Sequence, residues 1–510
     1  MLGLVGPMVT ILLPALLRPS AGGATAVEVM GSTVGEAFEA LFVAHPALRA
    51  WMVDRAGRMP RHLLVFHGDR RLPRGEWTAV PLASGDSLRL LASVAGGADD
   101  VRMRGFRRRA TVVEALAAAL EGVSPLPAEE VPLAECAGRV AAAPVISEVD
   151  VPPFARATMD GYALRAADTF GSSPYDPVIL AIGGESMPGR PAAGRLPPGT
   201  ACRIMTGAPL PRGGDAVLRA EDASEVGGRL EVRAAIAAGR NIGRVGEDVR
   251  RGDRVVPAGR RLLPQDVGLL SSVGCSRVAV HRRPRVRLIV SGNELLPPGE
   301  RPTGNRIVDS NGPMLAALVD RDGGVVEGSF RLPDDPVALR EALSRPGAEV
   351  IVTAGAASVG REDWVPVLVA ELGRLAVHGV GMRPSSPTGI GRIGGAPVLL
   401  LPGNPVSCLV AYDFFAGPVI RTLGGLSADL PYRVTSLPLA TRLVSQIGRT
   451  DYARVRVRSG RVEPVAIGGA SALSSVTSAD GFVVIPEGSE GYPEGAEVEV
   501  RLYRPPEGTG

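Results

Sequence analysis

The fold of this chain is decided by two stretches: Val350–Ser358, which reads VIVTAGAAS, and Val398–Ser407, which reads VLLLPGNPVS. In each, a run of apolar residues leads into a Gly-rich turn. α/β proteins build anion sites where a buried strand opens into such a turn and then a helix, because backbone N–H groups there face the ligand. Either turn alone is equally compatible with an ordinary strand–helix loop. The two in this order predict a binding site in a doubly wound α/β domain.

Further motifs, taken with the second turn, resemble the molybdopterin molybdotransferases, the family that includes the C-terminal domain of gephyrin. Leu401–Ser407 matches the family's Leu-Pro-Gly-Asn-Pro-Val-Ser turn intact, and Asp150–Ala163 is similar to its Pro-Phe…Ser-x-Met-Asp-Gly-Tyr-Ala segment. Shorter matches are Arg203–Ala208, Gly246–Asp248 and Gly292–Leu295. The resemblance covers roughly residues 105–505, and several ordered motifs over that length make it specific.

The resemblance implies a transferase of molybdenum cofactor biosynthesis. Its substrates are adenylylated molybdopterin and molybdate: the pyrophosphate bond is hydrolysed, AMP leaves, and molybdate is inserted at the dithiolene sulfurs. Such chemistry calls for a divalent metal, here Mg²⁺, for carboxylates that hold it, and for cations or N–H donors that bind the oxyanions. The alternative is a non-catalytic paralogue that binds molybdopterin or the finished cofactor and stores or delivers it.

The expected site residues are carried over from the family motifs. Catalytic roles are expected for Asp160, Thr206, Asp248 and Glu294, and metal binding for Asp160, Glu294 and Asp363. The residues expected to contact the cofactor are Gly355, Ser358, Asp334, Asp363, Arg383, Pro402, Gly403, Asn404, Ser407, Arg449 and Ser474. Asp160 and Glu294 each lie inside a recognisable motif, whereas any of these acids taken alone more often caps a turn or forms a surface ion pair.

The chain departs from the family pattern at several positions. In the first turn, Ala354 and Ala356 stand where the family prefers Ser or Gly and Gly, respectively. Arg383–Pro387 reads RPSSP where the family has Lys-Pro-Gly-Lys-Pro, and Gly379 occupies the position of an upstream lysine. One cation is thus replaced by another and up to two are lost. His378, next to the missing lysine, could compensate.

The composition excludes several classes of function. The 56 basic residues include no lysine, so every cationic contact must come from arginine, and lysine Schiff-base chemistry is excluded. A net charge of +3 gives no reason to expect nucleic acid. The four cysteines are far apart with no CxxC pair, which predicts neither a zinc site nor a disulfide framework. The apolar N-terminus lacks the basic region of a signal peptide, and no other stretch is long enough to cross a membrane. We therefore expect a cytoplasmic protein.

Residues 8–97 are expected to form a separate β-grasp domain. Strands are expected at Val9–Leu13, Ala26–Val29, His62–Phe66 and Ser87–Leu91, and Thr33–Glu36 is a capping box that opens a helix. The pattern is similar to the ubiquitin-like sulfur carriers, notably the small subunit of molybdopterin synthase, which end in Gly-Gly. Gly96-Gly97 would be that tail, since glycine lacks the Cβ that would block threading into an activating enzyme. The implied partners are the large subunit of molybdopterin synthase and an adenylating activator.

The rest of the chain is expected to divide into a linker and three further parts. These are a linker at 98–106, N-terminal and inserted β-rich lobes at 107–284, the α/β molybdopterin-binding domain at 285–425, and a strand-only, small C-terminal β-barrel at 431–505. A second capping box at Thr111–Glu114 predicts a helix to about Leu120. The family resemblance also implies a homodimer that binds a small pterin substrate.

Overall fold

The computed structural model describes residues 6–13, 17–53, 63–68, 70–72, 77–92, 109–358 and 363–504. The chain divides into two compact units: one comprises Met1–Val123, Pro284–Arg421 and Ala428–Gly510, and the other Ser124–Arg283 and Thr422–Ser427. The second unit is thus an insertion into the first, and each part is described by itself. Gly96, Gly97 and the expected linker at 98–106 lie outside the described residues.

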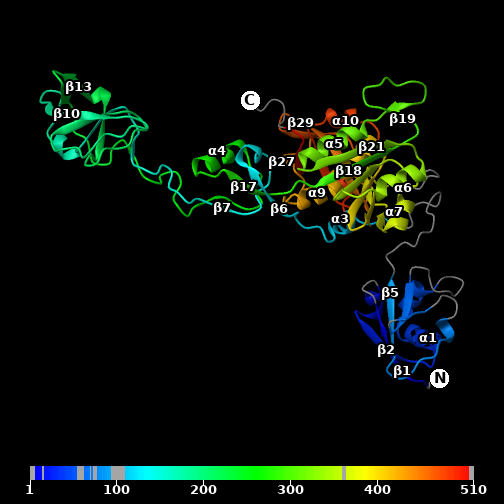
Figure 1. Cartoon of the computed structure of the whole chain (residues 1–510). Coiled ribbons are helices and arrows are strands. Elements are labelled where there is room, and N and C mark those ends of the chain that lie inside the picture. The colour runs from blue at the N-terminus through cyan, green and yellow to red at the C-terminus, as the bar shows by residue number, and fades with distance from the viewer. Residues whose placement is uncertain are drawn as a thin grey trace. The chain divides into compact units, whose positions relative to one another are not determined.

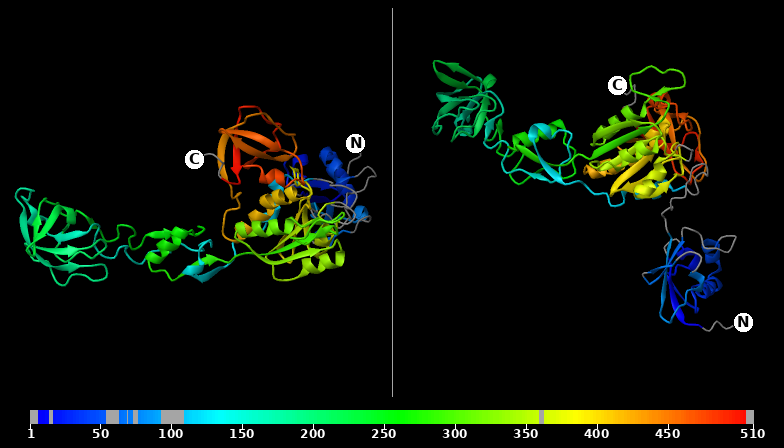
Figure 2. Two further views of the ribbon diagram at one scale, coloured as in Figure 1. Left: turned by 90° about the horizontal axis from the view of Figure 1, so that it is seen from above. Right: turned by 45° about the vertical axis from the view of Figure 1, so that its right-hand side comes forward.

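A β-grasp sheet with a packed helix forms the N-terminal domain (blue in Figure 1 and Figure 2). The strand order is β2-β1-β5-β3-β4, with β1 antiparallel to β2 and parallel to β5. The elements are β1 (Met8–Leu12), β2 (Ala26–Met30), α1 (Val34–Ala44), α2 (Pro46–Met52), β3 (Leu63–His67), β4 (Arg70–Arg71) and β5 (Ser87–Ala92). Thr33 caps α1 by accepting a hydrogen bond from the Glu36 N–H, while the Glu36 carboxylate accepts from the N–H of Ser32.

The second unit is rich in β-strands, as the sequence predicts. One lobe holds a six-stranded sheet in the order β12-β9-β11-β10-β14-β13, and the strand pairs β15-β8, β16-β7 and β17-β6 with helix α4 (Pro264–Ser272) complete the unit. The strands are β6 (Ala128–Pro132), β7 (Val145–Ile146), β8 (Arg156–Ala157), β9 (Gly161–Leu164), β10 (Val178–Ser186), β11 (Thr200–Ile204), β12 (Ala216–Arg219), β13 (Ala223–Val226), β14 (Arg229–Val232), β15 (Ile242–Gly243), β16 (Arg254–Val256) and β17 (Arg277–His281).

The α/β domain is built on a six-stranded mixed sheet in the order β21-β18-β22-β26-β25-β23. The strands β18, β21, β22 and β26 are parallel, as a doubly wound fold requires, whereas β25 is antiparallel to both of its neighbours. The sequence patterns predict only parallel strands here, so this antiparallel edge is a difference from the expected doubly wound sheet. The sequence feature that indicates an antiparallel pair here is Gly394-Gly395. It forms a two-residue hairpin turn between β25 and β26, with both residues at positive φ.

The elements of the α/β domain place the two Gly-rich turns directly after β22 and β26. They are α3 (Val112–Leu120), β18 (Arg285–Ser291), β19 (Leu295–Leu296), β20 (Ile307–Val308), α5 (Asn311–Arg321), β21 (Val325–Leu332), α6 (Pro336–Ser344), β22 (Val350–Ala354), α7 (Val365–Leu372), β23 (Arg374–His378), β24 (Met382–Arg383), β25 (Gly389–Ile393), β26 (Ala396–Leu401), α8 (Pro405–Ala411) and α9 (Gly417–Leu423).

A continuous helical segment runs from Pro405 to Leu423, because a π-helical turn (Tyr412–Ala416) joins α8 to α9. The segment is long and apolar enough to cross a membrane, but 83% of its most apolar window is buried inside the fold. It is therefore the core helix of this domain, and it contains the apolar run that follows the second Gly-rich turn.

The C-terminal region forms a sheet in the order β24-β29-β31-β33-β27, with β30 paired to β29. Its further elements are β27 (Arg433–Pro438), β28 (Leu443–Val444), β29 (Thr450–Arg458), β30 (Arg461–Ala466), α10 (Ser474–Thr477), β31 (Gly481–Ile485), β32 (Gly491–Tyr492) and β33 (Glu497–Leu502). The prediction of a strand-only region is wrong, because the helix α10 lies between β30 and β31. One bridge, between Leu439 and Val462, links the end of β27 to β30. A closed barrel stays a prediction, because a single bridge is not a continuous ladder.

Candidate active site

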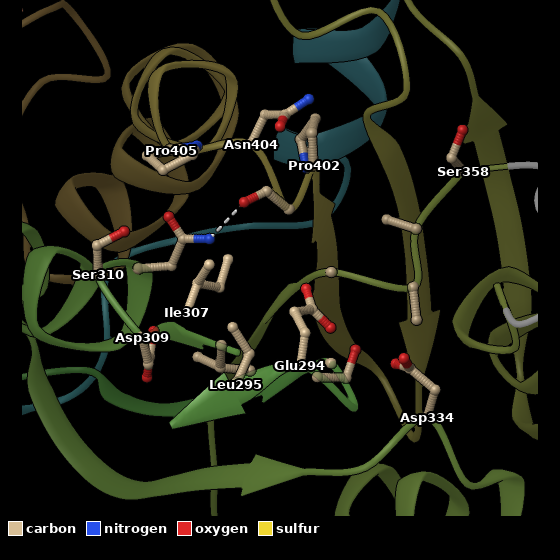
Figure 3. Close-up of a pocket in the computed structure, with 18 of the residues that line it drawn as sticks. Glu294, Leu295, Ile307, Asp309, Ser310, Asp334, Ser358, Pro402, Asn404 and Pro405 are labelled. Atoms are coloured by element: carbon tan, nitrogen blue, oxygen red, sulfur yellow. Dashed lines mark hydrogen bonds between the residues drawn. The ribbon is translucent and has the colours of Figure 1, made fainter. Parts of the chain in front are cut away.

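A cavity of about 920 Å³ opens at the carboxyl ends of β18, β22 and β26 (Figure 3). Ser291 ends β18, Gly355 follows β22 and Pro402 follows β26, and all three residues line the cavity. The chain leaves β18 toward β21 on one side and leaves β22 toward β26 on the other. In open α/β sheets such a reversal leaves a crevice between adjacent strand ends, which is where ligands bind. Topology and the two Gly-rich turns therefore indicate the same place.

The first Gly-rich turn requires glycine at position 355. Gly355 has a φ of +93°, and a Cβ there would lie 2.2 Å from the carbonyl oxygen of Ser291. Only glycine accepts both the conformation and the close approach. Ala356, where the family prefers glycine, also has a positive φ, +47°. This left-handed conformation costs a residue with a Cβ about 1–2 kcal/mol.

His378, at the end of β23, supports the same turn. Its Nε2 lies 3.1 Å from the carbonyl oxygens of both Ala357 and Ser358, to which a neutral ring donates. Burial lowers the pKa of His378, although the two carbonyl contacts favour the protonated form. The ring is therefore neutral near pH 7, so it positions the turn and does not replace the positive charge of the missing lysine.

Four acidic side chains line the cavity: Glu294, Asp309, Asp334 and Asp363. In Figure 3, Glu294 and Asp334 lie across the cavity from Pro402 and Asn404. Asp334 is tied to the loop that carries Glu294, because its N–H donates to Asn293 Oδ1 (3.2 Å) and its Oδ2 accepts from the Asn293 N–H (3.3 Å). The structure thus brings the three acids singled out from the α/β sequence into one cavity and adds Asp309.

The carboxylates of this cavity suit a hard divalent cation. Mg²⁺ takes oxygen ligands, and one or two protein carboxylates suffice where substrate phosphates complete its coordination shell. In the described part of the chain, no group of three or more His, Cys, Asp or Glu side chains is placed to hold a metal ion. A metal here would therefore share its coordination between one or two carboxylates and the ligand.

At the second Gly-rich turn, the first N–H groups of the following helix are hydrogen-bonded to another segment of the chain. In α8, the N–H groups of Val406 and Ser407 both donate to the carbonyl oxygen of Ala470, at 2.9 and 3.3 Å. The Ser471 hydroxyl donates to Asn404 Oδ1 at 2.9 Å. The expectation that N–H groups of this turn face an anion is therefore wrong for Val406 and Ser407, because a backbone carbonyl occupies that place.

A second cavity, of about 550 Å³, shares Pro387, Pro402 and Asn404 with the first. Arg383 and Arg449, the two arginines expected to contact an oxyanion, line this second cavity. Ser407 lines it as well. A cavity lined by acids and a cavity lined by arginines therefore meet at one wall.

A buried carboxylate orients Arg383 and forms an ion pair with Arg449. Asp451 has no exposed surface and accepts a hydrogen bond from Arg383 Nε at 3.0 Å, while Arg383 Nη2 pairs with its other oxygen. Arg449 Nε lies 3.3 Å from the same carboxylate, and the Ser445 hydroxyl donates to it at 2.7 Å. Two guanidinium charges against one carboxylate leave this cluster one net positive charge.

Ser385 is a second position where the family has glycine and this chain does not. Its φ is +89°, again in the left-handed region. Its hydroxyl donates to the carbonyl oxygen of Ser407 at 2.7 Å, and the residue is buried. This hydrogen bond offsets part of the conformational cost.

Arg454 is a buried residue that the sequence patterns miss. It lies in β29 with no exposed surface, and its guanidinium donates to the carbonyl oxygens of Ala466, Gly468 and Gly469. Its Nη1 also donates to Ser475 Oγ at 2.8 Å. Gly468 and Gly469 line the second cavity. Arg454 therefore holds the loop that closes the site over the start of α8.

The remaining expected residues have the following places. Ser474 begins α10 and lines neither of the two cavities, whereas its neighbour Ser471 lines the first. Asp160, Thr206 and Asp248 belong to the second unit, where Asp248 is exposed. Whether these three act together with Glu294 stays a prediction.

Asp160 is held by Thr206 within the second unit. Its Oδ1 accepts from both the N–H and the hydroxyl of Thr206, each at 2.7 Å. These hydrogen bonds, the backbone one first, lower the pKa of the exposed Asp160 carboxyl. The side chain is therefore an ionised acid of fixed orientation at neutral pH.

Three protein-family models match the chain in order: "MoeA N-terminal region (domain I and II)" at residues 110–274, "Probable molybdopterin binding domain" at 287–422, and "MoeA C-terminal region (domain IV)" at 436–503. The chain is 34% identical over 381 residues to molybdopterin molybdenumtransferase 2 of Mycobacterium tuberculosis, a match that covers 72% of this chain and 94% of that relative. The chain belongs to the MoeA family.

Other MoeA-family proteins match over the same extent. The molybdopterin molybdenumtransferase of Synechococcus elongatus is 33% identical over 387 residues, covering 74% of this chain and 95% of that protein. A crystal structure of the MoeA molybdopterin biosynthesis protein of Pyrococcus horikoshii has a TM-score of 0.66 at 35% identity and covers 78% of this chain and 100% of that one. Membership in the MoeA family makes this chain a transferase of molybdenum cofactor biosynthesis, which confirms the predicted enzyme class.

Proposed function

We propose that this MoeA-family chain inserts molybdate into adenylylated molybdopterin and releases AMP. The observation that carries the proposal is the wall, formed by Pro387, Pro402 and Asn404, that the acid-lined and the arginine-lined cavities share. A substrate pyrophosphate needs a cation held by carboxylates, and molybdate, an oxyanion, needs guanidinium groups. The two cavities offer these groups side by side.

Each set of residues has a distinct part in this proposal. Glu294 and Asp363 would hold Mg²⁺, which when bound neutralises phosphate charge at the bond to be hydrolysed. Arg383 and Arg449 bind the molybdate oxygens through charge-assisted hydrogen bonds. For Asp160 of the second unit, fixed and ionised by Thr206, the catalytic role stays an expectation from the family resemblance.

The test is reconstitution from adenylylated molybdopterin, molybdate and Mg²⁺ with the purified full chain. Cofactor formed, measured by activation of an apo-molybdoenzyme, should rise in step with AMP released. The alternative, a paralogue that only stores or delivers cofactor, is not favoured, because the acids of the cavity are retained. Tight binding of the pterin substrate with neither AMP release nor cofactor formation would establish that alternative instead.

For the N-terminal β-grasp domain we propose a sulfur-carrier role. The β2-β1-β5-β3-β4 strand order and the Gly96-Gly97 pair that follows β5 in the sequence support it. A carrier is activated at a free terminal carboxylate, so the chain would be cut after Gly97, and its partners would be a molybdopterin synthase large subunit and an adenylating activator. Intact-mass measurement on protein from the native host decides this. A fragment that ends at Gly97 as a thiocarboxylate supports the carrier, whereas uncut chain during cofactor synthesis leaves a docking role.

The assembly and location are also proposals. The family resemblance supports a homodimer, and the separated cysteines support the cytoplasm. Light scattering on the full chain tests the dimer, and fractionation of the native host tests the location.

A further inference from the structure

Two buried polar side chains of the first cavity each have an atom without a hydrogen-bond partner among the described residues. Ser291 is 6% exposed, and its hydroxyl is unpartnered. Asn311 is 7% exposed, and its Oδ1 is unpartnered. Both residues line the cavity. Native proteins rarely bury a polar atom without a partner, because the lost hydration is not replaced. Two such atoms in one cavity therefore point to a ligand that pairs with them.

Two glycines connect these side chains along the floor of the cavity. A Cβ on Gly355 would lie 3.1 Å from Ser291 Oγ, and a Cβ on Gly403 would lie 3.5 Å from the Cα of Gly355. Asn311 Nδ2 donates to the carbonyl oxygen of Gly403 at 2.7 Å, the dashed contact of Figure 3. Ser291, Gly355, Gly403 and Asn311 therefore form a continuous strip across the ends of β18, β22 and β26, with no side chain standing on the two glycines.

The chemistry of the strip defines what it can bind. Because Asn311 Nδ2 is engaged by Gly403, the free Oδ1 of Asn311 offers an acceptor. The Ser291 hydroxyl can donate or accept. A flat ring can approach closely over glycines, which have no Cβ. The strip thus suits a planar heterocycle that offers an N–H group to Asn311 Oδ1 and a second polar atom to the Ser291 hydroxyl.

We propose that Ser291 and Asn311 are specificity-determining residues that hydrogen-bond polar atoms on the rim of a substrate heterocycle lying over Gly355 and Gly403. This inference rests on the proposed function, because that function supplies two such rings, the pterin and the adenine of adenylylated molybdopterin. Both rings carry an exocyclic amino group next to a ring acceptor. Either ring therefore offers the polar atoms that the strip can bind, and binding measurements with two probes distinguish the rings.

Thr353 provides a matched control for Ser291. Its hydroxyl is also buried and unpartnered among the described residues, in the adjacent strand β22, but Thr353 is not among the residues that line either described cavity. Ser291→Ala and Thr353→Val each remove one unpartnered hydroxyl. Neither variant should lower the melting temperature, because no hydrogen bond within the fold is lost.

The two variants should differ in ligand binding. Calorimetric titration of the full chain with two probes, pterin (2-amino-4-oxopteridine) and AMP, gives their dissociation constants. Ser291→Ala should raise the Kd for one probe about tenfold, the loss of one ordinary hydrogen bond, while Thr353→Val leaves both Kd values unchanged. A loss confined to pterin assigns the strip to the pterin, and a loss confined to AMP assigns it to the adenine.

Two results would overturn the inference: equal Kd values in Ser291→Ala and Thr353→Val for both probes, or a wild-type chain that binds neither probe. Asn311→Leu removes both amide contacts, so it should lose the same probe as Ser291→Ala and also lower the melting temperature, since the Gly403 carbonyl loses its donor. Failure of the proposed function is distinguishable. A wild-type chain that binds a probe through Ser291 but forms no cofactor refutes the transferase reaction and leaves the recognition in place.

Discussion

Arg383 and Asp451 form an ion pair between β24 and β29, with Arg383 Nε 3.0 Å from Asp451 Oδ1. The same two residues are register partners in the parallel β24–β29 pair, so backbone and side chains fix the arginine together. Asp451 is fully buried, whereas Arg383 lines the second cavity. A carboxylate without exposed surface thus sets the direction of a guanidinium group at the site.

Replacing this carboxylate should affect both stability and molybdate use. Asp451→Asn keeps the shape but removes the charge that Arg383 and Arg449 face, so we expect a loss of about 2 kcal/mol in the free energy of unfolding. The molybdate concentration for half-maximal activity should rise, because Arg383 loses the carboxylate that orients it. Urea denaturation and molybdate titration measure the two effects. Asp222→Asn is the control, since its pair with Arg219 is partly exposed, with side-chain exposures of 31% and 50%, and its loss should change stability by less than about 0.5 kcal/mol. Equal losses in the two variants would contradict the assignment.

Ala356→Gly should stabilise the protein. The left-handed conformation at Ala356 costs about 1–2 kcal/mol, and the greater freedom of glycine in the unfolded chain returns about 0.4–1 kcal/mol of this, so the expected gain is about 0.5–1 kcal/mol. Ala357→Gly is the matched control, because Ala357 is buried and has no positive φ. Removing its methyl group should lower the free energy of unfolding. Chemical denaturation compares the two, and a loss at position 356 equal to that at 357 would refute the strain.

Glu294→Gln should abolish turnover and leave folding intact. The substitution is nearly isosteric, but it removes the charge that a hard cation requires. Glu294 is exposed on its loop, so the melting temperature should not change. The exposed Glu300, further along the same connection, gives the control variant Glu300→Gln. Normal rates of cofactor formation in Glu294→Gln would remove this residue from the site.

Ser386→Lys should lower the molybdate concentration needed for half-maximal activity. It restores a family lysine in the second cavity, and each charge-assisted contact is worth about 1.5–3 kcal/mol. The other lost lysine cannot be restored in the same way, because Gly379 is buried and has a φ of +95°. Ser386→Gln, similar in length but uncharged, is the control. An effect shared by both variants would mean that charge is not the cause.

His378 should make stability depend on pH below neutrality. Burial lowers its folded-state pKa below the ordinary value of 6.5, so the unfolded chain takes up this proton first as the pH falls. The contribution of His378 is therefore complete above about pH 6.5 and is lost as the pH falls toward the lower folded-state pKa. His378→Gln, which keeps an N–H donor but does not titrate, should flatten the decline in unfolding free energy between pH 7.5 and about 5. A decline as steep as in the wild type would show that other groups cause it.

Elements that depend on local patterns were predictable from the sequence. The capping box at the start of α3 is complete, because the Thr111 hydroxyl accepts from the Glu114 N–H (3.1 Å) and the Glu114 carboxylate accepts from the Thr111 N–H (3.0 Å). The strands before both Gly-rich turns also form as expected. These features rest on residues only a few positions apart.

The buried polar residues of the site were not predictable in that way. Arg454 lies in the alternating segment RVRVR, which predicts an exposed strand face, and its burial depends on a loop that folds back from residues 466–475. Ser291 and Asn311 are recognisable as site residues only in the folded sheet, which brings β18 beside Gly355 and Gly403. One local signal was available: Asp309-Ser310-Asn311 precedes an apolar run, and Asp309 Oδ1 indeed accepts from the Gly312 N–H at 2.9 Å.

Through the carbonyl of Ala470, the C-terminal region contributes directly to the site. This contribution is not evident from the sequence, because Ala470 is far along the chain from Val406 and Ser407. Many nucleotide-binding proteins leave the first N–H groups of such a helix open for a phosphate oxygen. Here the polypeptide supplies its own oxygen to Val406 and Ser407, from a loop that Arg454 secures. A ligand oxygen that competes for these two N–H groups would have to displace that loop. The wall between the two cavities is therefore formed by segments far apart in the chain. A truncation before β29 would disrupt this wall even though every residue of the α/β sheet remained.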